Sequence, residues 1–175
     1  FTKTEISGNP ALKYVNEYIP EKSGTSNFSI KGTEPLDFSK GALLLSYDVT
    51  PQSNLTWLGD GAKSNILIPT LRIGSTEISQ LSIIEHGGIK AAYKTAPTAW
   101  GRSAYLTGWE NNTLVADTTV KFQLLLEKEG NQITATQYIN EKPVYYTLSD
   151  EAKLASVTVD ITEEELAKEW TLTMA

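Results

Sequence analysis

The chain has 175 residues, and 15 lysines and arginines against 21 aspartates and glutamates give it a net charge of −6. This balance disfavours binding to nucleic acid or to an anionic membrane surface, both of which need clustered positive charge. The lack of cysteine excludes disulfides, thiolate catalysis and iron–sulfur clusters, and one histidine, His86, leaves little material for a transition-metal site. No stretch reaches the roughly 18 apolar residues of a membrane span. The length suits one domain, and we expect residues 1–175 to form it.

Strand signals dominate the chain, because short runs rich in β-branched and aromatic residues alternate with Gly, Pro, Asn or Asp. Turn signals about ten residues apart are typical of a β-sandwich or barrel. Pro69 demotes its strand to a sheet edge or marks a bulge. The strongest predicted strands cover residues 42–50, 65–73, 89–94, 120–127, 132–139, 144–148 and 156–161. Weaker candidates cover residues 4–7, 13–18, 27–31, 104–107 and 171–174.

One short helix is predicted near the C-terminus. Thr162 is followed by three glutamates in a capping box, in which its hydroxyl accepts the amide of Glu165 and that carboxylate reaches back. Ile161 and Leu166 are placed for a hydrophobic staple. Leu166 and Trp170 lie four residues apart, so we expect the helix to present one apolar stripe to the sheets.

The segment from residue 117 to 148 reads as a meander with a turn at Gly130. Its residues Gln137-Tyr138-Ile139-Asn140 resemble the back-sheet hairpin of concanavalin A-like jelly rolls, which include laminin-G and pentraxin modules; Glu141 stands where the family usually has glycine. Residues 36–41, before the strand at 42–50, are similar to the entry into an early core strand of that superfamily. The resemblance implies an all-β, two-sheet antiparallel jelly-roll β-sandwich, here with one short C-terminal helix. Lectins, carbohydrate-binding modules, glycosidases, polysaccharide lyases and interaction domains share this fold.

Several aromatic residues lie in loop-like segments rich in Gly, Asn and Thr. Indole and phenol rings stack on the C–H faces of sugars, while amides and arginine bind the hydroxyls. The same indoles also suit packing in the core, and for Trp57 packing is the better interpretation. The predicted ligand-binding residues are Trp57, Trp100, Arg102, Tyr105, Trp109 and Asn111.

Catalysis is the less favoured interpretation. Glu85 and His86 form a proton-transfer pair only if the following Gly-Gly turn redirects them, because adjacent strand residues point to opposite faces. Glu127 lies near a hairpin tip and lacks a facing carboxylate at the spacing that a glycosidase needs. Calcium, a frequent structural ion of jelly rolls, has two candidate ligands, Asp60 and Asp117, and a role in turn formation explains each equally well. We expect no other cofactor.

The sequence therefore predicts a non-catalytic module that binds polysaccharide by aromatic stacking and hydrogen bonding. The acidic balance suits a neutral polysaccharide. The composition is typical of domains that bacteria export, so we expect an extracellular or cell-surface location within a larger multidomain protein. Two alternatives stay open: an interaction domain of a surface protein or adhesin without a sugar site, and a small glycoside hydrolase or lyase that uses Glu85 or Glu127.

Overall fold

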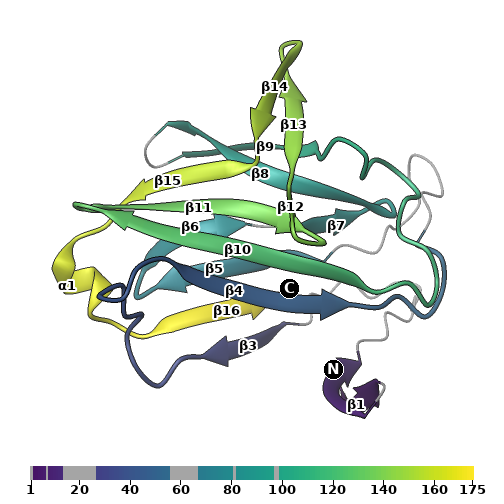
Figure 1. Ribbon diagram of the computed structural model, residues 1–175, viewed down its shortest axis with the longest axis horizontal. Helices are drawn as coiled ribbons and strands as arrows, with labels where there is room; N and C mark the ends of the chain where they lie inside the picture. The colour runs from purple at the N-terminus through teal and green to yellow at the C-terminus, as the bar shows by residue number, and fades with distance from the viewer. Residues whose placement is uncertain (1, 7, 14–26, 56–66, 81, 97–98) are drawn as a thin grey trace, which may run out of the picture.

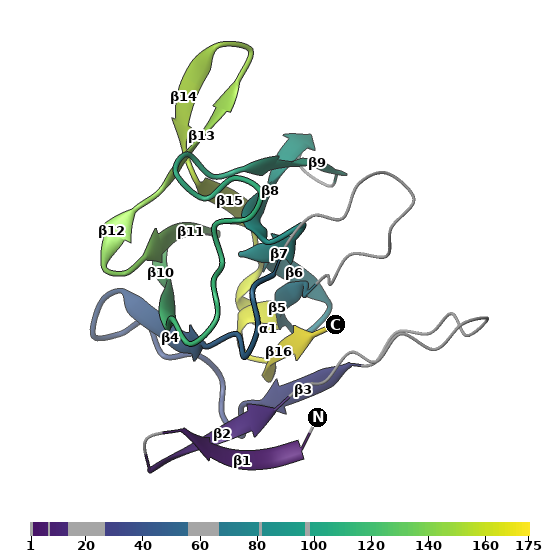
Figure 2. The same cartoon turned by 90° about the vertical axis from the view of Figure 1, so that its right-hand side faces the viewer.

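The computed structural model describes residues 2–6, 8–13, 27–55, 67–80, 82–96 and 99–175, and gives the backbone alone for residues 93–96 and 99–103. These residues form mostly β structure, with antiparallel strands in several small sheets and one short helix. The fold class predicted from the sequence is confirmed at this level. Figures 1 and 2 show the two larger sheets as layers of one body, from which two hairpins protrude.

The larger sheet has the strand order β12-β11-β10-β4, with β15 also paired to β11. In β10 the even-numbered residues from Val120 to Leu126 are buried and the odd-numbered ones are more exposed, as expected for a strand with one wet face. Gly130 has a φ of +55° in the turn after β10, which confirms the predicted hairpin. The strands are β4 (Leu43–Val49), β10 (Val120–Glu129), β11 (Gln132–Ile139), β12 (Lys142–Pro143) and β15 (Ser156–Asp160).

The second sheet has the order β3-β16-β5-β6 and faces the first. Its strands are β3 (Phe28–Lys31), β5 (Pro69–Ile73), β6 (Thr76–Gln80) and β16 (Trp170–Met174). Pro69 does not mark an edge strand, because β5 lies between β16 and β6. Proline is tolerated there because it is the first residue of the strand. The predicted irregularity is present two residues later, as a register shift between Leu71 and Arg72.

The remaining strands form a three-stranded sheet, β7-β8-β9, and two hairpins. The sheet consists of β7 (Ile83–Glu85), β8 (Gly88–Ala96) and β9 (Ala99–Tyr105). The hairpins are β1 (Thr2–Ile6) with β2 (Asn9–Lys13) and β13 (Tyr145–Leu148) with β14 (Glu151–Leu154). Figure 2 shows them at opposite ends of the body.

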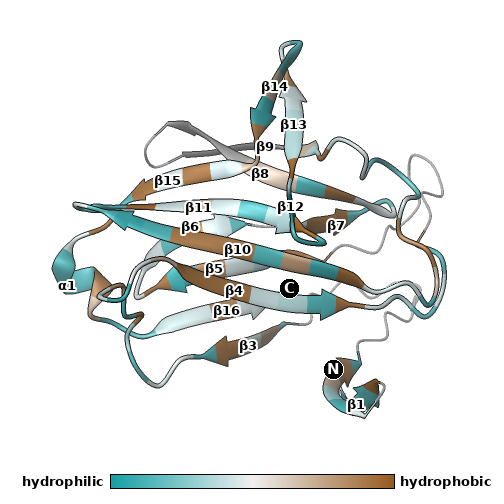
Figure 3. Cartoon of the chain, in the orientation of Figure 1, coloured by the Kyte–Doolittle hydropathy of each residue, from teal (hydrophilic) through white to brown (hydrophobic). Residues whose placement is uncertain are grey.

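Two hydrophobic clusters form the core. The first lies between the two larger sheets and contains Leu71, Ile73, Ile78, Leu124, Leu126, Ile133, Ala135, Val157, Val159, Ile161 and Leu172. The second lies toward the three-stranded sheet and contains Ile84, Ile89, Ala91, Leu106, Leu114, Val120, Phe122, Ile139, Val144, Tyr146 and Ala155. Strands β10 and β11 contribute to both clusters, and apolar segments follow these strands in Figure 3.

Most predicted strands are confirmed to within a few residues, including β11 over its whole length. The candidate at 13–18 lies almost wholly outside the described residues, although Lys13 ends β2. The structure adds β6, β7, β12 and β14, and β2 apart from Lys13, for which no strands were predicted from the sequence.

The predicted helix is present as α1 (Glu163–Leu166), and the Thr162 hydroxyl accepts the amide of Glu165 at 3.1 Å. Two details of the prediction are wrong. The Glu165 carboxylate does not reach back to Thr162; it accepts hydrogen bonds from the backbone amide and hydroxyl of Ser75, in the turn between β5 and β6. Trp170 is not helical, because α1 ends at Leu166, and Trp170 begins β16 half-buried. Within the described residues, no helix has the length and apolar character needed to cross a membrane.

Candidate functional site

The turn between β7 and β8 brings Glu85 and His86 together. His86 and Gly87 both have positive φ, +54° and +69°, between the paired residues Glu85 and Gly88. Two such residues make a type I′ turn, whose twist matches that of the flanking strands. The turn redirects the histidine, so its Nε2 lies 3.9 Å from Oε1 of Glu85. The turn is formed by His86-Gly87, with Gly88 already in β8, rather than by the Gly-Gly pair that the sequence suggested; a proton-transfer role for Glu85 and His86 stays a prediction.

Lys90 joins this pair on one face of the three-stranded sheet. Its Nζ lies 2.6 Å from Oε2 of Glu85 and 4.5 Å from the centre of the Tyr105 ring, which stands opposite Lys90 on β9. The Lys90 and Glu85 side chains are only 15% and 22% exposed. The ammonium is thus held between a carboxylate and an aromatic face, an arrangement that orients both partners.

The loop after β9 wraps around the β7–β8 turn. The Thr113 amide donates to the Gly87 carbonyl at 2.8 Å, and the Ile89 amide donates to the Trp109 carbonyl at 2.8 Å. A Cβ on Gly88 would lie 2.5 Å from the carbonyl oxygen of Glu110, so this close approach requires glycine. The backbone bonds fix the loop against the sheet and make the site preformed.

Aromatic and polar groups of this loop and of β9 lie partly open to solvent. Trp109 is half-buried and packs one side against the second cluster. Loss of hydration raises the pKa of the Tyr105 hydroxyl; the Lys90 ammonium offsets part of that rise and Glu85 adds to it.

Three buried side-chain polar atoms in the described part of the chain have no hydrogen-bond partner. Two of them, the Tyr105 hydroxyl oxygen and Oδ1 of Asn111, belong to this region. The third is Oε1 of Gln137, a fully buried residue in β11. Buried polar atoms are normally paired, so the concentration of exceptions in one region needs an explanation.

The structure brings together three of the six predicted ligand-binding residues. Tyr105, Trp109 and Asn111 lie beside the β7–β8 turn, through the strand pairing and loop bonds given above. Trp100 and Arg102 lie in β9, and their side chains are outside the described part of the structure. Trp57 falls outside the described residues altogether.

Lys90 was not predicted from the sequence. A two-residue turn at His86-Gly87 places Lys90 diagonally across from Glu85, within reach of a long side chain. The signal in the sequence was a single lysine in the apolar strand that follows a turn, with a glutamate directly before that turn.

The other predicted sites gain no support. Asp117 is exposed in a turn, with a φ of +57°, and Asp60 lies outside the described residues. No group of three or more His, Asp or Glu side chains among the described residues could hold a metal ion. Glu127 is exposed near the tip of the β10–β11 hairpin, opposite Thr134.

The comparisons with known proteins assign no family. No family model matches the sequence, and a search of the curated proteins finds none that matches it.

Proposed function

We propose that this chain is a non-catalytic carbohydrate-binding module of the jelly-roll type, exported to the cell surface or beyond it. It binds a neutral polysaccharide at the β7–β8 turn and the loop that follows β9. Tyr105 and Trp109 supply aromatic faces, and Lys90, Glu85 and Asn111 supply hydrogen bonds.

The observation that carries this proposal is the pair of half-buried aromatic residues, Tyr105 and Trp109, beside the ion pair of Lys90 and Glu85. Aromatic faces stack on sugar rings, and the ammonium and the carboxylate can bind sugar hydroxyls. The fixed loop favours binding, because little conformational entropy is lost when a ligand settles on a preformed surface.

A binding role for Glu85 fits its surroundings better than a catalytic one. A glycosidase needs a second carboxylate across the cleft, and the group that Glu85 contacts is instead the Lys90 ammonium, 2.6 Å away. The jelly-roll assignment draws on the two antiparallel sheets that share the first cluster.

Affinity electrophoresis against neutral β-glucan, xylan and mannan tests the proposal, with tryptophan fluorescence followed in parallel. We expect retention by one of these glycans. Tyr105→Leu removes the aromatic face and should weaken binding about three- to tenfold, since an aromatic contact contributes about 0.5–1.5 kcal/mol beyond its buried area. Trp109→Ala should weaken it tenfold or more.

Tyr138→Ala is the matched control, because Tyr138 is a half-buried tyrosine on the outer face of the other sheet. Circular dichroism of each variant confirms folding. Retention by no glycan, or a loss in Tyr138→Ala that exceeds the loss in Trp109→Ala, would contradict the proposed site.

A further inference from the structure

The first cluster is open along one side of the body. Ile30 in β3 stands opposite Leu172 in β16, so both side chains belong to the inner face of their sheet. Leu172 is 4% exposed, whereas Ile30 is 44% exposed. Ile30 is therefore an inner-face residue that the described chain leaves uncovered, although Leu36 and Phe38 of the loop after β3 pack against the first cluster.

The same side of the body carries two free strand edges. Among the described strands, β3 pairs with β16 alone and β4 pairs with β10 alone, so each ends its sheet. Free edges offer unpaired amides and carbonyls to a further strand. The two edges therefore flank an opening into which an extended segment fits.

The β1–β2 hairpin lies beside this opening without closing it. Ile6 is 45% exposed and Leu12 is 41% exposed, and the two point to opposite faces of the hairpin. A two-stranded hairpin with no core of its own is marginally stable in water. This hairpin therefore needs a surface on which to bury its apolar residues.

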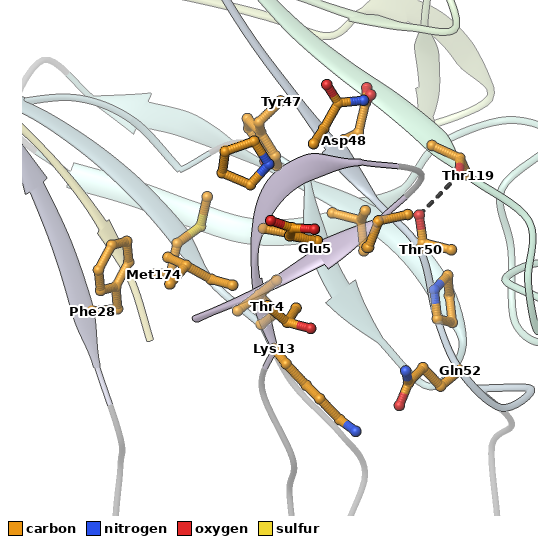
Figure 4. A pocket seen from close by; sticks show the side chains of 18 of the residues that line it. Thr4, Glu5, Lys13, Phe28, Tyr47, Asp48, Thr50, Gln52, Thr119 and Met174 are labelled. Carbon is orange, nitrogen blue, oxygen red and sulfur yellow. Dashed lines mark hydrogen bonds between the residues drawn. The ribbon is translucent and has the colours of Figure 1, made fainter. Parts of the chain in front are cut away.

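A groove of about 1140 Å³ separates the hairpin from the body. Figure 4 shows Thr4, Glu5 and Lys13 of the hairpin on one side and Phe28, Tyr47 and Met174 of the sheets on the other. The volume exceeds the roughly 300–1,000 Å³ of typical small-molecule sites and suits a polypeptide segment. The groove's apolar lining from the body includes Phe28, Ile30, Tyr47, Val49, Leu55, Leu67, Ile84 and Met174.

We propose that the β1–β2 hairpin of one chain fills the groove of a second copy, adding to the free edges of β3 and β4. Within its own chain the hairpin leaves both Ile6 and Leu12 exposed, so these side chains stay incompletely buried in the monomer. Local charge favours the contact: Asp48 is the charged residue that the body contributes to the lining of the groove, whereas the hairpin carries two lysines against one glutamate.

Each copy keeps its hairpin as one wall of its own groove and inserts the outer face of that hairpin into the groove of the other copy, so a two-fold arrangement fills both grooves in a closed dimer. The groove reaches Ile84, next to Glu85, but none of the five residues proposed to bind glycan lines it. Dimerisation therefore holds or fails independently of glycan binding.

Light scattering coupled to size-exclusion chromatography, at about 10–500 μM chain, tests the assembly. We expect the wild type to approach twice 19.2 kDa as concentration rises. The full-length double variant Ile6→Asp/Leu12→Asp should remain monomeric, because it replaces the two apolar contacts of the hairpin with carboxylates that would be desolvated on binding. Leu154→Asp is the matched control: Leu154 is 39% exposed on the β13–β14 hairpin and should leave the dimer intact.

Cross-linking then identifies the contact, since the chain has no native cysteine. A mixture of Leu12→Cys and Ile30→Cys chains should form the mixed disulfide at least tenfold faster than a mixture of Leu12→Cys and Leu154→Cys chains. A wild type that stays monomeric up to 500 μM would overturn the proposal. So would a Leu12→Cys/Ile30→Cys chain that closes its disulfide only within the monomer.

Discussion

The two larger sheets meet at two margins that differ in how they are closed. At the α1 margin, the Glu165 carboxylate binds the β5–β6 turn through Ser75, and Glu163 pairs with Lys128 of β10 at 2.9 Å. At the β3–β4 margin no side-chain hydrogen bond or ion pair of this kind joins the sheets among the described residues, and Ile30 stays exposed. Both margins have apolar residues to bury, so the difference lies in the connection across the sheets.

A chain segment that passes directly from one sheet to the other can place side chains that bind both sheets. Helix α1 lies between β15 of the larger sheet and β16 of the other, so its capping and ion-pairing groups reach both. The β3–β4 margin is also joined by a loop, which packs Leu36 and Phe38 against the first cluster, but the hydrogen bond from the Ser39 amide to Asp37 stays within the loop itself.

The largest expected effect separates two residues that face each other across β3 and β16. Leu172→Ala should lower the free energy of unfolding by about 2–5 kcal/mol, because it leaves a cavity in the first cluster. Ile30→Ala should cost less than about 1 kcal/mol in the monomer, because that side chain is already 44% exposed. Urea unfolding at low chain concentration measures both, and equal losses would mean that the β3–β4 margin is closed.

A smaller effect on stability tests the contact between Glu165 and the β5–β6 turn at the α1 margin. Gly74 and Gly130 both have a φ of +55°, but a Cβ on Gly74 would collide with the Glu165 carboxylate, whereas Gly130 has open space. Gly130→Ala should cost about 1–2 kcal/mol from backbone strain alone. Gly74→Ala should cost more, because the same strain adds to displacement of Glu165. Thermal unfolding of the two variants compares their losses of stability. Equal losses would show that the contact between Glu165 and the β5–β6 turn contributes nothing.

The smallest expected effect is on acid stability. Hydrogen bonds from Lys168 and Ser75 lower the pKa of Glu165 from 4.5 to about 2. A carboxyl whose folded pKa is depressed stabilises the fold fully above its unfolded pKa and loses that contribution as pH falls from about 4.5 to about 2. Urea midpoints between pH 7 and pH 2 should fall less steeply over that window for Glu165→Gln than for the wild type. Parallel curves would contradict the assignment.

Much of the β architecture could be predicted from the sequence, because alternation and turn residues are local signals. The run 132–139 became β11 without a change of boundary, and the Thr162 cap sits where the pattern placed it. The strands that were missed are short, and β14 is exposed along its whole length, so it carries no hydrophobic alternation to read.

The candidate site was predictable only in part. Tyr105 and Trp109 stood out as aromatic residues in a polar segment, but their proximity to Lys90 depends on strand register. Register follows from turn geometry, and the His86-Gly87 turn was recognised as a turn without its type. The open β3–β4 margin could not be predicted at all, because an unclosed core is a property of strand order and leaves no local pattern.

The hairpin of β10 and β11 has a further consequence for how the chain acquires its structure. Its two strands are adjacent in sequence, and their eight paired positions close around a two-residue turn, so little loop entropy opposes their pairing. Because Leu124 and Ile133 enter one cluster while Phe122 and Ile139 enter the other, early formation of this hairpin would template both halves of the core. The same sharing couples their unfolding, since neither cluster can come apart without disturbing strands that the other also uses.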